Sequence, residues 1–436
     1  MKKITLSLAI LFLSVLTYSQ NEKIKVYFNH RVDNEASSII DAKYISNLDD
    51  TIISYIDRAE QSIDVCVYNN SNTEITDALN SAYYRGVDIR YITDEETSNS
   101  ALSGLNSNIN VLEDNGTGIM HNKFLIIDVN DPEKATLITG STNFTYQSFF
   151  QDFNNMIIFQ NQDIALVYKQ EFDEMWGGTA LTPDASNAKF GTAKTDNTNH
   201  HVNVNGTNVD IYFSPTDGVN SEIINLINTA NNDIFFAQYY LTRDDIADAL
   251  IQRKNAGVFI RGLMEETEGY GTEYDNLKQN GIPVYSYLNE PYLLHHKYCI
   301  IDPFNSSSDP AVLTGSHNWS TSAETKNDEN TVIVHDFYVA QEYYEEFSAR
   351  WRDITNVKTI AEKNIKIYSN NNTLFVNTNN DNKKEILVFS IDGKLIISEI
   401  FNRNIELKIN EHPGVYIVKV VSDNNSISKK IVISII

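Results

Sequence analysis

The segment Ile75–Leu79 (ITDAL) recurs later in the chain as Ile246–Leu250 (IADAL), 171 residues further on. Gly86–Arg90 (GVDIR) recurs at the same distance as Gly257–Arg261 (GVFIR). A solenoid has a period of roughly 20 to 50 residues, and this period is far longer. The two matches therefore predict a duplicated domain within one chain.

Each copy has the same order of elements. In the first copy, 62–68 and 87–92 have strand patterns, and 75–84 has helical spacing. The second copy repeats this order, with its elements expected at 233–239, 246–254 and 258–264. Strands that alternate with helices indicate an α/β fold. We expect two duplicated α/β lobes, each with a mixed sheet flanked by helices and with an active site at the lobe interface.

The N-terminus has the pattern of a secretory signal. Lys2 and Lys3 precede the apolar run Ile4–Leu16, and small or hydroxylated residues follow before Gln20. A single membrane anchor is the alternative, but the run is shorter than the roughly 20 residues that a span needs. No later segment is long and apolar enough to span a bilayer. We expect export of the mature chain.

Near residue 360 the helical periodicity gives way to short alternating strands, such as Ile386–Ser390 and Val415–Val421. These predict a small all-β sandwich. The expected organisation is a signal peptide (1–19), a first lobe (24–180), a connector (181–207), a second lobe (208–356) and a C-terminal β-sandwich (365–436).

The net charge and the number of cysteines exclude or disfavour some classes of protein. The 34 basic and 58 acidic residues give a net charge of −24, which disfavours a surface that binds the nucleic-acid polyanion. Two cysteines in 436 residues exclude a disulfide framework.

The residues that carry chemistry occur once in each copy. His121–Asp128 (HNKFLIID) and His295–Asp302 (HHKYCIID) share the pattern H-x-K-x4-D. Gly140–Asn143 (GSTN) and Gly315–Asn318 (GSHN) follow them. Residues two apart on a strand share a face, so the His and Lys of each motif should project together.

These residue types suit a phosphodiester. Lysines supply positive charge, and Ser and Asn side chains supply hydrogen-bond donors for the phosphate oxygens. One imidazole can attack phosphorus, and a second can protonate the leaving oxygen. A zinc site is the alternative, but the motif lacks Cys–His spacing and each lysine would repel a cation. Tyr239, Tyr240 and Tyr292 are candidates to line the cleft.

The chain resembles the phospholipase D superfamily, whose mark is a duplicated H-x-K-x4-D followed by G-S-x-N. The resemblance covers residues 24 to 355 and implies a covalent phosphohistidine formed without a metal or other cofactor. It implies that His121 is the nucleophile and His295 the general acid and base. The other residues carried over are the phosphate-binding Lys123, Lys297, Asn143 and Asn318, the assisting Ser141 and Ser316, and Asp128 and Asp302, which we expect to orient or support the site.

One position departs from the family pattern. Members often carry a Glu after the second motif that orients a histidine, and Glu329 stands at that place in the second copy. In the first copy the corresponding residue is Asn154. An amide can accept a hydrogen bond but cannot stabilise an imidazolium by charge, so one histidine should be tuned differently from the other.

The C-terminal segment has a resemblance of its own. Pro413–Lys419 (PGVYIVK) and Lys429–Ile433 (KKIVI) resemble the C-terminal sorting domain of type IX secretion cargo. This implies the type IX machinery as a partner and a location outside the cell or at its outer surface. An accessory β-sandwich that binds surfaces or carbohydrate is the alternative.

Together these features predict a secreted phosphoric diester hydrolase of phospholipase D type. We expect it to convert a phosphatidylcholine-like lipid to phosphatidic acid and the free head group. An endonuclease of the same superfamily is the first alternative, and a non-catalytic surface adhesin is the second. The intact His, Lys, Asp and Asn positions of both motifs disfavour the adhesin.

Overall fold

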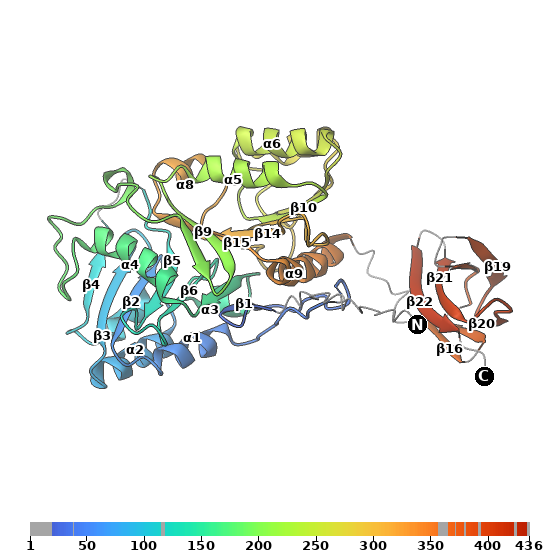
Figure 1. Ribbon diagram of the computed structural model, residues 1–436, viewed down its shortest axis with the longest axis horizontal. Coiled ribbons are helices and arrows are strands. Elements are labelled where there is room, and N and C mark those ends of the chain that lie inside the picture. Colours follow the sequence, from blue (N-terminus) through green and yellow to red (C-terminus); the bar gives the residue numbers. More distant parts are fainter. Residues whose placement is uncertain are drawn as a thin grey trace, which may run out of the picture. The chain divides into compact units, whose positions relative to one another are not determined.

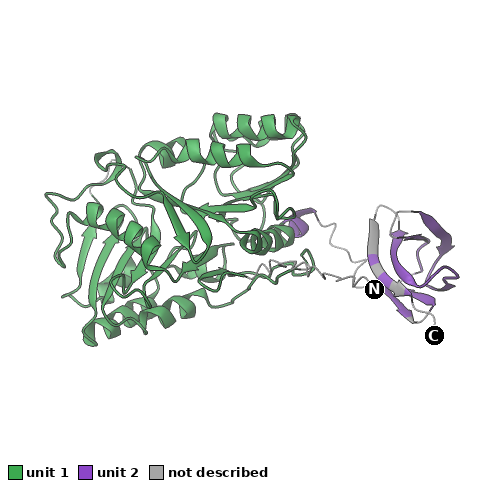
Figure 2. Ribbon diagram, in the orientation of Figure 1, with its two compact units in different colours: residues 1–350 green, residues 351–436 purple. Residues whose placement is uncertain are grey.

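The computed structural model describes residues 20–37, 39–114, 118–355, 365–370, 372–378, 381–390, 394–422 and 425–433. The expected signal peptide, 1–19, lies outside the described residues. The chain forms two compact units, Met1–Arg350 and Trp351–Ile436 (Figure 2). The larger unit contains both copies of the repeat.

The first copy is built on a seven-stranded mixed sheet with the order β1-β7-β6-β5-β2-β3-β4. Its strands are β1 (Ile24–Phe28), β2 (Ser62–Val67), β3 (Asp88–Thr93), β4 (Asn110–Glu113), β5 (Lys123–Ile127), β6 (Thr136–Gly140) and β7 (Asn155–Phe159). Its helices are α1 (Leu48–Ile56), α2 (Thr73–Tyr84), η1 (Ser100–Gly104), α3 (Tyr146–Phe150) and α4 (Gln162–Trp176). β2, β3 and β4 run parallel, and the other pairs are antiparallel.

The second copy is built on an eight-stranded mixed sheet with the order β12-β11-β10-β13-β14-β15-β9-β8. Its strands are β8 (His201–Val204), β9 (Thr207–Ser214), β10 (Asp233–Gln238), β11 (Phe259–Met264), β12 (Val284–Ser286), β13 (Lys297–Ile301), β14 (Ala311–Gly315) and β15 (Glu329–His335). Its helices are α5 (Val219–Thr229), α6 (Asp244–Asn255), α7 (Tyr274–Gln279), α8 (Thr321–Thr325) and α9 (Phe337–Thr355).

The two sheets have the same topology apart from one strand. β4-β3-β2-β5-β6-β7-β1 correspond in order and direction to β12-β11-β10-β13-β14-β15-β9. The additional edge strand, β8, comes from the segment 181–207, which also contains η2 (Gly191–Ala193). The predicted pair of α/β lobes with mixed sheets flanked by helices is therefore confirmed.

Neighbouring side chains of each central strand point to opposite faces of the sheet, and a layer of helices packs on each face. In β5, Leu125 belongs to the core that α1 and α2 cover, whereas its neighbour Phe124 packs edge-to-face on Tyr168 of α4, with ring centroids 5.0 Å apart. In β10, Phe236 likewise belongs to the core under α5 and α6, whereas Phe235 contacts Phe347 of α9. Each sheet thus carries helices on both faces (Figure 1).

The helices α4 and α9 also connect the two lobes. Tyr168 on α4 donates a hydrogen bond to Asn330 on β15, at 3.1 Å. Tyr343 on α9 donates an equivalent bond to Asn155 on β7, also at 3.1 Å. All four side chains are buried, so these matched bonds hold the lobes in a fixed relation.

The smaller unit consists of two antiparallel sheets, β16-β17-β20 and β19-β18-β21-β22. Their strands are β16 (Ile365–Asn370), β17 (Thr373–Thr378), β18 (Lys384–Ser390), β19 (Leu395–Phe401), β20 (Asn404–Lys408), β21 (Gly414–Ser422) and β22 (Asn425–Ile433). Leu374 and Val376 from one sheet share a buried core with Ile386 and Val418 from the other. This confirms the predicted small β-sandwich. Within the described part of the chain, every helix is too short or too polar to cross a bilayer.

Candidate active site

Both predicted motifs lie where the lobes meet. The strands β5 and β13 begin at Lys123 and Lys297, so each histidine stands two residues ahead of its strand rather than on it. An isolated bridge pairs Met120 with Asp328 of the other lobe, and the amide of His121 donates to the Asp328 carbonyl at 2.9 Å. The backbone of the second lobe thereby holds His121 of the first lobe in place.

The second histidine is held in the same way. Phe153 pairs with Leu294, and the amide of His295 donates to the Phe153 carbonyl at 3.1 Å. Both histidines are therefore placed by contacts between the lobes, as the predicted interface site requires.

The residue that orients each imidazole also comes from the opposite lobe. Nδ1 of His121 lies 2.8 Å from Oε2 of Glu329, and Nδ1 of His295 lies 2.8 Å from Oδ1 of Asn154. Both acceptors are fully buried. A carboxylate or amide oxygen can only accept, so Nδ1 carries the proton in both rings. Each ring then offers Nε2 to a substrate.

The Asn154 amide has a defined orientation. Its Nδ2 donates to the carbonyls of Ser148 and Asp152, at 3.1 and 3.3 Å. Its Oδ1 accepts from Ser141 Oγ at 2.8 Å as well as from His295. The oxygen therefore faces the imidazole. One half of the site thus has a neutral amide where the other has the carboxyl group of Glu329, whose pKa burial raises.

The two lysines occupy equivalent places. Nζ of Lys123 donates to the His121 carbonyl at 2.7 Å, and Nζ of Lys297 donates to the His295 carbonyl at 3.0 Å. Each ammonium lies 5.2 Å from the ring centroid of a tyrosine, Tyr68 or Tyr239. This is within cation–π range.

Burial changes the ionisation of these groups. It lowers the pKa of Lys297 to about 7 and holds the pKa of Lys123 well below its usual value. Burial and the two lysines also hold the pKa values of His121 and His295 well below their usual range. Both imidazoles are then neutral near neutral pH, which is the form that can attack phosphorus.

The G-S-x-N motifs contribute in two ways. Ser141 and Ser316 accept the backbone N–H groups of Asn155 and Asn330, at 3.1 and 3.0 Å. These serines therefore hold the starts of β7 and β15, where Asn154 and Glu329 lie. The amide oxygens of Asn143 and Asn318 are buried and have no hydrogen-bond partner within the described chain.

The structure does not bring Asp128 and Asp302 to the histidines. Each lies at the far end of its strand, about 20 Å from the histidine at the usual rise per residue. Asp128 accepts the backbone N–H groups of Glu60, Gln61 and Ser62, at 2.7 to 3.2 Å. Asp302 does the same for residues 231–233. These two motif aspartates therefore hold the backbone ahead of β2 and β10, at a distance from both histidines.

Sequence reasoning also missed several residues of the site. Tyr68 packs on His121, with ring centroids 5.0 Å apart, as Tyr239 packs on His295 at 5.4 Å. Tyr68 lies 171 residues before Tyr239, so the repeat itself carried the signal. Asn155 and Asn330 also occupy matching places, immediately after Asn154 and Glu329.

Comparison with known families agrees with this geometry. Residues 52–176 and 223–351, together more than half of the chain, match the family model described as cardiolipin synthase, PLD-like domain. The chain belongs to the PLD-like family. Residues 357–434 of this PLD-like protein match the model of the secretion system C-terminal sorting domain.

The PLD-like protein matches two curated relatives over 27% and 28% of its length. It is 32% identical over 123 residues to a mitochondrial cardiolipin hydrolase of Xenopus tropicalis, which is 27% of this chain and 56% of that protein. It is 38% identical over 125 residues to a phospholipase D of Rickettsia conorii, which is 28% and 60% of the two chains. The chain thus spans less than two thirds of the length of these relatives.

Among solved structures, the phosphatidylserine synthase of Haemophilus influenzae has the same fold. The TM-score is 0.52 at 12% identity, over 77% of this chain and 87% of that one.

Proposed function

We propose that this PLD-like protein is a secreted phospholipase D-type phosphodiesterase that hydrolyses a phosphatidylcholine-like phospholipid to phosphatidic acid and the free head group. The observation that carries the proposal is the convergence of His121 and His295, each with its Nδ1 held by the opposite lobe. The two lysines and the two asparagines of the motifs supply the charge and donors for one phosphodiester.

Because His121 contacts a carboxyl group and His295 contacts an amide, the two histidines take different roles in the reaction. Attack by Nε2 of His121 makes an N–P bond and a cationic ring, which the Glu329 carboxylate stabilises. The bond from phosphorus to the head-group oxygen breaks, and His295 gives that oxygen a proton. His295 needs no permanent negative partner for this step, because the bound phosphodiester anion itself favours the protonated ring.

The second half-reaction reverses these roles. Water gives a proton to His295 and attacks phosphorus, and the N–P bond to His121 breaks. Phosphatidic acid leaves, which restores neutral His121, and His295 releases to solvent the proton that it took from water. The same two side chains thus act in both steps, and no further group is consumed.

Charge and relatives favour a lipid over a nucleic acid. The net charge of −24 opposes a polyanion that gains affinity by neutralising several phosphates. Two of the matched relatives are a cardiolipin hydrolase and a phospholipase D. The matched sorting domain supports release through the type IX machinery to the cell surface or the medium.

The test is to incubate the purified protein separately with phosphatidylcholine vesicles, single- and double-stranded DNA, and RNA. We expect choline and phosphatidic acid from the vesicles at a rate that EDTA leaves almost unchanged, because the lysines supply the positive charge. DNA cleavage without lipid turnover would identify a nuclease. Tight binding to surfaces without turnover of any diester would identify an adhesin.

A further inference from the structure

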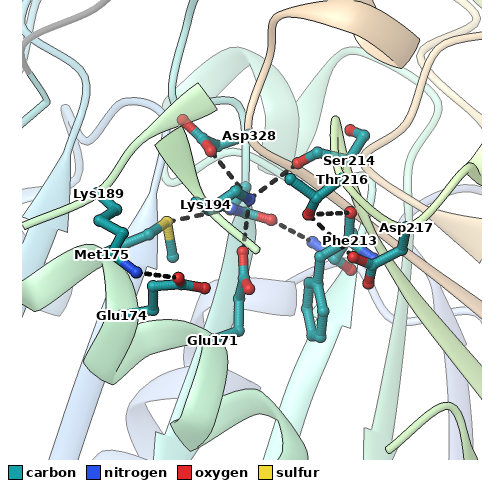
Figure 3. A network of polar contacts seen from close by, with 12 residues as sticks. Glu171, Glu174, Met175, Lys189, Lys194, Phe213, Ser214, Thr216, Asp217 and Asp328 are labelled. Atoms are coloured by element: carbon teal, nitrogen blue, oxygen red, sulfur yellow. Dashed lines mark hydrogen bonds and ion pairs between the residues drawn. The ribbon is translucent and has the colours of Figure 1, made fainter. Parts of the chain in front are cut away.

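A buried lysine from the segment between the lobes joins the two halves of the molecule (Figure 3). Nζ of Lys194 lies 2.6 Å from Oε1 of Glu171 on α4 of the first lobe. It also lies 2.9 Å from Oδ1 of Asp328 and 2.8 Å from the carbonyl of Ser214, both in the second lobe. The Lys194 side chain is completely buried.

Both contacts to the second lobe lie beside Glu329. Asp328 precedes Glu329 in the chain, and its carbonyl accepts the amide of His121. Ser214 is the residue paired with Glu329 across the β9–β15 ladder. Lys194 therefore holds both strands on which the position of the Glu329 carboxylate depends.

The ammonium also balances the charge of this cluster. Burial opposes its protonation, but the carboxylates of Asp328 and Glu171 raise the pKa of Lys194, so it stays charged. Without it, two buried carboxylates would be left unpaired between the lobes, which is strongly unfavourable.

The half of the site around His295 contains a counterpart of Lys194, which is Arg350. Glu346 follows Glu329 at the spacing at which Glu171 follows Asn154. Arg350 lies 3.5 Å from Glu346, and its guanidinium lies 4.3 Å from the ring centroid of Phe153, which directly precedes Asn154. In both halves, a buried cation thus joins a helix glutamate to the residue before the group that orients a histidine.

We propose that Lys194 is a positioning residue, which sets the Glu329 carboxylate against His121 by tying the strands of the second lobe to α4 of the first. The inference deepens the proposed function and rests on it, because its effect on rate is exerted through His121. It also assigns the connector a role in catalysis.

The first experiment compares Lys194→Met with a matched control, Lys189→Met. Lys189 pairs at 2.9 Å with Glu174 of α4, the helix that also carries Glu171 (Figure 3). Unlike that of Lys194, its side chain is 45% exposed. With bis(p-nitrophenyl) phosphate, K194M should lower kcat about 10- to 100-fold and change KM little. K189M should match the wild type. A folded K194M with wild-type kcat would overturn the proposal.

A double-mutant cycle with Glu329→Gln separates positioning from general support. If Lys194 acts through Glu329, K194M should cost much less in the E329Q background than in the wild type. An equal loss in both backgrounds would mean a merely structural role and would overturn the proposal. If K194M does not fold, Asp328→Asn takes its place in the cycle, because it leaves the Lys194–Glu171 pair balanced.

A spectroscopic measurement keeps this test independent of the proposed function. The Nδ1 proton of His121, assigned by its loss in His121→Asn, should shift in ¹⁵N-histidine spectra of K194M or D328N and stay unchanged in K189M. If the wild type hydrolyses no diester while this resonance shifts, the proposed function fails and the positioning role stands. An unshifted resonance would overturn the positioning role.

Discussion

Asn154 and Glu329 occupy equivalent positions in the two copies, yet one presents a neutral amide to His295 and the other a carboxylate to His121, both at 2.8 Å. The site is thus symmetric in geometry and asymmetric in charge. A cationic phosphohistidine gains most from a carboxylate neighbour, so we propose that this difference makes His121 the nucleophile.

The first prediction tests that order by trapping. With a p-nitrophenyl phosphodiester, whose leaving group needs no acid, His295→Asn should release one burst of p-nitrophenol and accumulate on His121 the phosphoryl group that still carries the second ester. His121→Asn should give no burst, because the nucleophile is missing. Mass spectrometry of peptides quenched at high pH locates the phosphate. A burst in H121N with none in H295N would reverse the assignment.

The second prediction concerns pH. Because burial lowers the pKa of Lys297 to about 7, its ammonium is present below that pH and lost above it. The value of kcat/KM should therefore fall as pH rises through about 7. Lys297→Arg keeps its charge and should move this decline to higher pH, whereas Lys189→Arg should not. An identical alkaline limb in K297R and the wild type would contradict the role of Lys297.

The third prediction concerns Asp128. Asp128→Ala leaves three backbone N–H groups without their acceptor, which should lower the free energy of unfolding by about 2 to 4 kcal/mol. Urea denaturation measures this loss. The folded variant should keep its kcat, because the aspartate is remote from both histidines. A collapse of kcat at unchanged stability would instead give Asp128 a part in catalysis.

The fourth prediction separates the units. A chain that ends at Thr355 retains both lobes and lacks the strands β16 to β22. It should keep full activity on a soluble diester but fail to leave the periplasm of its native host, because the matched sorting domain is gone. Unchanged export would contradict the sorting role. Lower activity on vesicles alone would instead make the β-sandwich a surface-binding domain.

The repeat and the chemistry could be read from the order of the residues. The matches 171 residues apart predict two copies of one fold because a repeated pattern of apolar and polar residues builds the same strands and helices. The strand Ser62–Val67 and the helix Thr73–Tyr84 lie within two residues of their expected bounds for this reason. The two H-x-K motifs can likewise be recognised from residue type and spacing alone, without knowledge of the fold.

Only the tertiary structure decided how the two copies complete each other. His121 and Glu329 are 208 residues apart, and His295 and Asn154 are 141 apart, so no local pattern can pair them. Contacts between the two lobes set these distances, and they also give Lys194 its place between the lobes. Asp128 shows the same limit, because its place in the motif suggests catalysis while the rise of a strand carries it about 20 Å away. Residue type and spacing act within a few residues of chain, whereas the charge beside each histidine depends on contacts between segments that meet only in the folded molecule.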